Sequence, residues 1–83
     1  MYFFYIIRSL KNKKLHLGIT SDINKRLFSH NQGGNTSTKA YKPFEIIYYS
    51  AFKNKTDAVN AEKYYKTSSG WRRIKLMLKS SLK

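Results

Sequence analysis

Residues 2–20, YFFYIIRSLKNKKLHLGIT, decide the fold of this 83-residue chain. The first run, YFFYIIRS at 2–9, is dense in aromatic and β-branched residues and predicts a strand. Both faces of this strand are apolar, so we expect it to lie inside the sheet. The lysine-rich LKNKK at 10–14 predicts a turn, and LHLGIT at 15–20 predicts a second strand. The two runs together predict a β-hairpin.

The segment after the hairpin predicts a helix that ends near Asn31. Ser21 or Thr20 is expected to cap it, with Asp22 in its first turn, where a carboxylate interacts favourably with the helix dipole. A basic loop, NQGGNTSTKAYKP at 31–43, then ends at the only proline of the chain.

The C-terminal half predicts one more strand and two helices. FEIIYYSAF at 44–52 is the strand, and Thr56 is expected to cap a helix over 57–67. SSG at 68–70 is expected to break that helix, and WRRIKLMLKSSL at 71–82 predicts a last amphipathic helix. The order is β-β-α-β-α-α, an α+β fold in a single domain over 1–83. The apolar stripe of the last helix is expected to be Trp71, Ile74, Met77 and Leu78.

Charge is the most informative feature of the composition. Seventeen Lys and Arg against four Asp and Glu give a net charge of +13. Self-repulsion at this charge destabilises a compact chain, so we expect a polyanionic partner, nucleic acid before an anionic membrane surface. The alternative is a generic basic protein whose lysines only aid solubility.

Cysteine content and hydropathy bound the environment of the protein. The absence of cysteine excludes a disulfide framework and a thiolate metal site, which fits a cytoplasmic location. The apolar run YFFYII at 2–7 is too short to span a bilayer and has no basic segment before it. We therefore expect a soluble protein that starts at Met1.

One of the four acids stands apart from the others. Asp22 and Asp57 fall in first helical turns, and Glu45 begins a strand, so ordinary structural roles are sufficient for them. Glu62, by contrast, shares a helical stripe with two small alanines and points toward the body of the protein. Burial of its carboxylate requires a cation or a metal. The stripe is Ala58, Ala61, Glu62 and Tyr65.

The first helix carries a second candidate group. Ile23, Arg26, Leu27 and His30 share one face by i, i+3, i+4 spacing. With so few acids in the chain, a phosphate oxygen is a natural bidentate partner for Arg26. The alternative is an amphipathic arginine whose charged head reaches solvent from the helix edge.

The hairpin adds two further candidates. Phe3, Tyr5 and Ile7 share one face of the first strand, and the second strand has a face that bears His16, Gly18 and Thr20. A polar face without side-chain bulk suits an approaching ligand or backbone. Taken singly, His16 and Tyr5 are more often structural residues whose polar atoms are satisfied.

Together these candidates form a potential reaction site. Tyr5, His16, Arg26, His30 and Glu62 are expected to converge on one face of the sheet. They offer a general base, a phosphate clamp and one carboxylate. One carboxylate is enough for Mg²⁺, which takes other ligands from water and substrate phosphate, but it is thin for zinc.

At this point the chain resembles the GIY-YIG nuclease superfamily, in particular its short stand-alone group related to the N-terminal catalytic domain of the UvrC repair nuclease. The resemblance covers nearly the whole chain, and its order and spacing are more specific than any single motif. The matching segments are FYI at 4–6, HLG at 16–18, GITSDINKRLFSHNQG at 18–33, STKAYKPFEIIYY at 37–49, AEKYYK at 61–66 and GWRRIKLML at 70–78.

The resemblance implies a fold and a set of roles. The fold is a small α/β domain with a three-stranded antiparallel sheet, and the activity is phosphodiester hydrolysis with a single divalent metal, Mg²⁺ or Mn²⁺. Tyr5 matches the first motif tyrosine and Gly18 the second motif glycine. Arg26 matches the arginine that stabilises transition-state charge, His30 a histidine one turn later, and Glu62 the metal ligand.

Two positions depart from the family pattern. Phe3 replaces the first motif glycine, which is common in the short group and mainly structural. His16 replaces the second motif tyrosine, which is a chemical change. If Tyr5 is the base, His16 can take over its proton or position water, since an imidazole titrates near ~6.5 and a phenol near ~10. If the second motif tyrosine is essential, cleavage is weak or absent, and the basic surface only binds nucleic acid.

The sequence therefore predicts a divalent-metal-dependent endonuclease, and we expect its substrate to be DNA in preference to RNA. The alternatives are a nucleic-acid-binding module of the same fold that does not cleave, and a small basic protein that binds an acidic protein surface. The oligomeric state stays open. The residues expected to grip backbone phosphates are Lys39, Lys42, Arg72, Arg73, Lys75 and Lys79.

Overall fold

The computed structural model describes residues 1–33 and 39–83, so part of the basic loop, including Ser37 and Thr38 of the resemblance, lies outside the described residues. The predicted element order is confirmed, with an additional 3₁₀ turn. In the described residues no helix has the length and apolar character needed to cross a membrane. The elements are β1 (Tyr2–Ser9), β2 (Leu15–Thr20), α1 (Ile23–Asn31), η1 (Lys39–Tyr41), β3 (Phe44–Phe52), α2 (Lys55–Tyr65) and α3 (Ser68–Met77).

The sheet is antiparallel with the order β2-β1-β3, which places β1 at its centre as predicted. The hairpin register pairs Tyr5 with Gly18 across β1 and β2. The pairing with β3 is interrupted between Ile6 and Ile7, where the register shifts. Among the described strands β2 pairs only with β1, so it forms an edge of this sheet.

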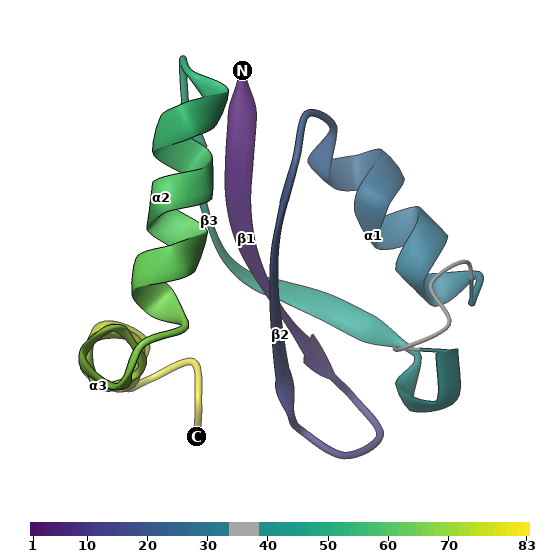
Figure 1. Ribbon diagram of the computed structural model, residues 1–83. Helices are drawn as coiled ribbons and strands as arrows, with labels where there is room; N and C mark the ends of the chain where they lie inside the picture. Colours follow the sequence, from purple (N-terminus) through teal and green to yellow (C-terminus); the bar gives the residue numbers. More distant parts are fainter. Residues whose placement is uncertain (34–38) are drawn as a thin grey trace.

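The two faces of the sheet carry different helices (Figure 1). Phe4 and Ile6 are fully buried on one face, where Ile74 and Leu78 complete a core cluster. Alternate residues of β1 point to the other face, where Tyr5 and Ile7 pack with Phe44. Helix α1 covers this second face through Ile23 and Leu27, and α2 and α3 cover the first. The domain therefore has a helical layer on each side of the sheet.

The start of α1 differs from the prediction. Asp22, and neither Ser21 nor Thr20, is the N-cap, because its carboxylate accepts a hydrogen bond from the backbone N–H of Lys25 at 3.0 Å. Thr20 makes a local turn instead, since its hydroxyl accepts from the N–H of Asp22 at 3.1 Å.

The corner between α2 and α3 also differs. Helix α2 begins at Lys55, before the predicted cap Thr56, and ends at Tyr65. SSG at 68–70 forms the first turn of α3, because the Thr67 hydroxyl accepts from the N–H of Gly70 at 3.1 Å. Gly70 packs against the backbone of Tyr64 and Tyr65, where any side chain would collide. The segment therefore turns the chain by capping a new helix.

Candidate active site

An open cavity of about 530 Å³ wraps around β2 at the edge of the sheet. Its walls include residues from both faces of that strand, because side chains alternate along β2 and no further strand of the described sheet covers its outer edge. All five predicted catalytic residues line it. The lining residues are Tyr5, Leu15, His16, Leu17, Gly18, Ile19, Arg26, His30, Glu62, Lys66 and Trp71.

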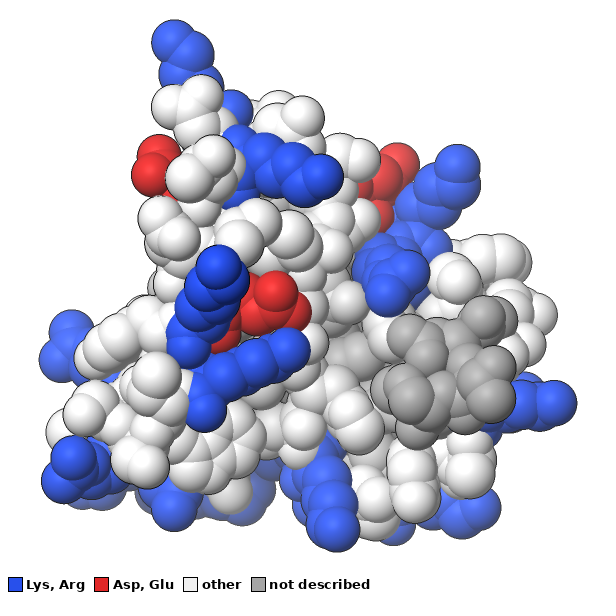
Figure 2. All heavy atoms as spheres, in the orientation of Figure 1, with Lys and Arg blue, Asp and Glu red and all other residues white. Residues whose placement is uncertain are grey.

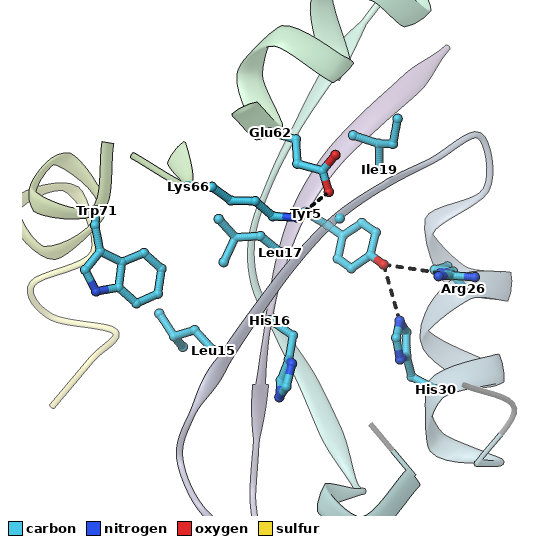
Figure 3. A pocket seen from close by; sticks show the side chains of 11 residues that line it. Tyr5, Leu15, His16, Leu17, Ile19, Arg26, His30, Glu62, Lys66 and Trp71 are labelled. Atoms are coloured by element: carbon cyan, nitrogen blue, oxygen red, sulfur yellow. Dashed lines mark hydrogen bonds and ion pairs between the residues drawn. The ribbon is translucent and has the colours of Figure 1, made fainter. Parts of the chain in front are cut away.

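The hydroxyl of Tyr5 is held between two side chains of α1. Arg26 donates a hydrogen bond from Nε to the Tyr5 oxygen at 3.2 Å, and Nε2 of His30 lies 3.3 Å from the same oxygen (Figure 3). Arg26 and His30 can both reach it because they lie one helical turn apart. The predicted shared face of α1 is thus confirmed, and it brings these two residues to one atom.

Gly18 makes room for this arrangement. The Tyr5 ring crosses directly over its cross-strand partner, and a β carbon at position 18 would lie 2.7 Å from Cζ of Tyr5. Any larger residue would therefore push the ring away from Arg26 and His30. The backbone of the edge strand approaches the ring where the sequence predicted a face without side-chain bulk.

His30 is buried, with only 4% of its surface exposed. Burial lowers its pKa from 6.5, and the positive charge of Arg26 and the neighbouring His16 lower it further. His30 is therefore neutral at neutral pH. A neutral imidazole whose Nε2 carries no proton can accept the hydrogen bond of the Tyr5 hydroxyl.

His16 lies in the same cavity but in a different environment. Its ring packs edge to face against Phe44 at 5.3 Å between centroids and stacks on Tyr41 at 6.4 Å. Figure 3 shows it pointing away from the Tyr5 hydroxyl, whose described partners are Arg26 and His30. Nε2 of His16 is buried without a hydrogen bond to any described residue. Burial and then Lys14 lower the pKa of His16 from 6.5.

Glu62 reaches the cavity from the other side of the sheet. The expectation that all five residues share one sheet face is wrong, because α2 covers the face opposite α1. Glu62 extends past the edge strand into the cavity, and 23% of its side chain is exposed. The stripe on which it lies is as predicted, since Ala58 is buried and both Ala61 and Tyr65 pack on the core.

Lys66 is the cation that accompanies Glu62. Its ammonium group lies 3.2 Å from the carboxylate, and it lines the same cavity. Sequence reasoning missed Lys66, although the i, i+4 spacing from Glu62 could have found it. It missed Trp71 as a cavity residue as well, because the indole was expected in the core.

Asn31 and Phe44 were also missed as positioning residues. The Asn31 side chain accepts from the N–H of Phe44 at 2.6 Å and donates to its carbonyl at 3.3 Å. It thereby fixes the end of α1 to the start of β3. The Phe44 ring contacts the rings of both His16 and His30, so this clamp positions both imidazoles.

The predicted phosphate-gripping residues are all exposed, along α3 and around η1. Figure 2 shows Lys and Arg side chains over much of the visible face, with few acidic side chains between them. Glu45, one of the four acids of the chain, is paired with Arg8 across β1 and β3 at 2.8 Å. The surface around the cavity is therefore suited to a polyanion.

The donor set of the cavity fits a weakly held hard cation. Within the described residues, no cluster of three or more His, Cys, Asp and Glu is present that could hold a metal. Glu62 is a half-buried carboxylate paired with the ammonium group of Lys66 at 3.2 Å. A lone carboxylate fits Mg²⁺, which keeps several waters, and does not fit a protein-only zinc site.

Comparison with known proteins places these residues in a family context. The family model of the GIY-YIG catalytic domain matches residues 1–75. The UPF0213 protein YazA of Bacillus subtilis is 38% identical over 66 residues, which are 78% of this chain and 66% of that protein. A UPF0213 protein of Pediococcus pentosaceus is 34% identical over 98% of this chain and 85% of its own length.

A solved structure has the same fold. The solution NMR structure of the UPF0213 protein BH0048 from Bacillus halodurans matches with a TM-score of 0.53 and 27% sequence identity. The match covers 93% of this chain and 83% of that chain. The similarity therefore extends over both helical layers and the sheet between them.

Proposed function

The chain belongs to the GIY-YIG nuclease family, and from this premise we propose that it is a divalent-metal-dependent endonuclease that hydrolyses phosphodiester bonds, with DNA as the preferred substrate. The observation that carries the proposal is the Tyr5 hydroxyl held between Arg26 and His30 on the wall of an open cavity. In this position the Tyr5 oxygen accepts a hydrogen bond from a cation and lies within hydrogen-bond distance of a neutral imidazole.

In the proposed reaction, Tyr5 is the group that activates water. The Tyr5 hydroxyl passes its proton to Nε2 of His30, and Nε–H of Arg26 stabilises the oxygen that remains. That oxygen then takes a proton from water, whose oxygen attacks phosphorus as the bond to the leaving oxygen breaks. The lowered pKa of His30 keeps its imidazole neutral and ready to accept at neutral pH.

Arg26 has a second role in this proposal. One of its N–H groups is bound to Tyr5, and the guanidinium carries further donors that suit the oxygens of a phosphate. Arg26 is exposed on the cavity wall, so an entering phosphate can contact it. It thereby aligns the phosphate with the Tyr5 oxygen and stabilises the charge that develops on attack.

Glu62 is the residue that would hold the divalent cation, Mg²⁺ or Mn²⁺, at a single site. When bound, such an ion supplies positive charge to the phosphate oxygens and the leaving group. Lys66 neutralises Glu62 until then and lies where it can also contact phosphate. His16 lines the same cavity and is proposed to orient water or substrate from its place beside Phe44.

The basic surface supports nucleic acid as the substrate class. Contacts from lysine and arginine to backbone phosphates position a strand without reading its sequence. The exposed residues proposed for this role are Lys39, Lys42, Arg72, Arg73, Lys75 and Lys79.

The test is a cleavage assay with supercoiled and branched DNA and single-stranded RNA, in Mg²⁺, Mn²⁺ or EDTA. We expect metal-dependent cleavage that is lost in Arg26→Ala and Glu62→Gln. Lys63→Gln serves as a control, because Lys63 is an exposed residue of α2 next to Glu62 and is not among the residues that line the cavity.

The exchange of the motif tyrosine for His16 gives the assay a second informative outcome. Salt-dependent binding of nucleic acid without cleavage in either metal would overturn the nuclease. It would identify a nucleic-acid-binding module of the same fold. His16→Tyr, which restores the family residue, should then gain cleavage.

A further inference from the structure

Trp71 lies at the rim of the cavity and not in the core. Trp71 is 37% exposed, whereas Ile74 on the same helix is fully buried. Gly70, one residue earlier, is the residue that packs against α2, and this turns the side chain of Trp71 toward the cavity. An exposed indole is costly to leave in water, so its position suggests a partner.

The cavity has two chemically different halves. Arg26, His30 and the Tyr5 hydroxyl form a polar half beside α1. Leu15, Leu17 and Trp71 form an apolar half on the opposite side, where Figure 3 shows the indole extending from α3 toward the two leucines. Lys66 and Glu62 lie between the halves.

We propose that Trp71, with Leu15 and Leu17, forms a subsite for one unpaired nucleobase of the strand whose phosphate occupies the polar half. A nucleic-acid strand has the same division, since each charged phosphate is followed within one nucleotide by an apolar aromatic ring. The proposal rests on the proposed function only in taking nucleic acid as the ligand, and it does not depend on cleavage.

The physical basis is stacking on a preformed aromatic surface. Every nucleobase has a π-face, so an indole binds bases with little preference for sequence. The cavity volume of about 530 Å³ falls in the range of small-molecule sites and leaves space for a nucleotide. Bases within a duplex already stack on each other, so only a strand that is single or locally opened can occupy this subsite.

The chain provides its own reporter, because Trp71 is its only tryptophan. We would titrate the full chain in EDTA with single-stranded oligothymidylate and follow the intrinsic fluorescence. Two matched ligands carry the same number of phosphates: an abasic oligomer and a hairpin-closed duplex. We expect strong quenching by oligothymidylate and little quenching by either of the others, although both bind through their phosphates.

Two variants test whether the indole contributes affinity. Trp71→Leu should weaken binding of oligothymidylate by about tenfold and leave binding of the abasic oligomer within about twofold. Trp71→Phe should retain part of the affinity. Tyr64→Leu removes another exposed aromatic residue, one that does not line the cavity. It should change the affinity for neither oligothymidylate nor the abasic oligomer. Circular dichroism establishes that each variant is folded.

Equal quenching by the abasic oligomer or by the duplex would overturn the subsite, and so would equal weakening of both ligands by Trp71→Leu. These binding outcomes are independent of whether the chain cleaves nucleic acid. A wild-type chain that cleaves DNA but fails these tests keeps the proposed function without the subsite. A chain that passes them but cleaves in no metal keeps the subsite without the nuclease.

Discussion

The phenol ring of Tyr5 lies directly over Gly18, its partner across β1 and β2, and a β carbon on that glycine would sit 2.7 Å from Cζ of the ring. Gly18 thus provides the space in which Tyr5 reaches Arg26 and His30. The two residues are coupled because they form one cross-strand pair.

Gly18→Ala should therefore lower the cleavage rate by about 100-fold, since the displaced ring loses both hydrogen-bond partners. We expect overpacking to lower the free energy of unfolding by about 1–3 kcal/mol, which circular dichroism and urea denaturation can measure. Gly33→Ala is a control, because its positive φ of 77° makes that substitution strained without involving Tyr5. A normal rate in folded Gly18→Ala would contradict this role.

The pH–rate profile should have an acid limb set by His30. Burial and Arg26 lower the pKa of His30 from 6.5, so the imidazole accepts a proton from Tyr5 above that pKa and cannot accept one below it. The rate should fall with decreasing pH through a midpoint below 6.5. His30→Ala should be slow and lack this limb. A midpoint above 6.5 in single-turnover measurements would exclude His30 as the acceptor.

Stability should also fall in acid, for a related reason. The pKa values of His16 and His30 are lower in the folded chain than the ordinary 6.5, so below 6.5 the unfolded chain binds more protons. The free energy of unfolding should therefore decrease between about pH 7 and pH 5, as measured by urea denaturation. His16→Phe, which keeps an aromatic ring beside Phe44, should flatten this dependence. If His16→Phe leaves the slope of unfolding free energy against pH unchanged, His16 does not contribute to the loss of stability in acid.

Lys66→Met should increase the affinity of the protein for Mn²⁺. The ammonium group of Lys66 lies 3.2 Å from the Glu62 carboxylate, so it competes with Mn²⁺ for the negative charge of that carboxylate. Because 58% of the Lys66 side chain is exposed to solvent, which screens its charge, we expect the gain to be only about threefold. Titration followed by electron paramagnetic resonance measures it, with Lys63→Met as a control for the loss of one charge and Glu62→Gln to abolish binding. Equal affinities in Lys66→Met and Lys63→Met would remove Lys66 from the site.

The hairpin and the spacing along α1 could be predicted because they depend on local periodicity. Alternation fixes which residues share a strand face, and helical spacing brings Arg26 and His30 to one side. The face of the sheet that each helix covers depends on tertiary packing and not on local periodicity, so the sequence did not reveal that Glu62 reaches the cavity around the edge strand. The position of Trp71 was mispredicted because the tight packing of Gly70 on α2 changes which residues of α3 face the core.

Asn31 should prove important for activity although it does not line the cavity. Its amide makes two hydrogen bonds to the backbone of Phe44, whose ring contacts His16 and His30. Asn31→Ala should lower the free energy of unfolding by about 1–3 kcal/mol, because it leaves backbone groups of a buried residue unpaired.

If the clamp positions His30, Asn31→Ala should also lower kcat by about tenfold at temperatures where it is fully folded, with KM nearly unchanged. Asn31→Asp keeps the acceptor for the Phe44 N–H and should recover part of both losses. Gln32→Ala, at the exposed neighbouring position, should change neither. If the His30 imidazole moved away from Tyr5, proton transfer and therefore kcat would be slower. A loss of stability with a normal kcat would thus show that the Asn31 clamp supports only the fold.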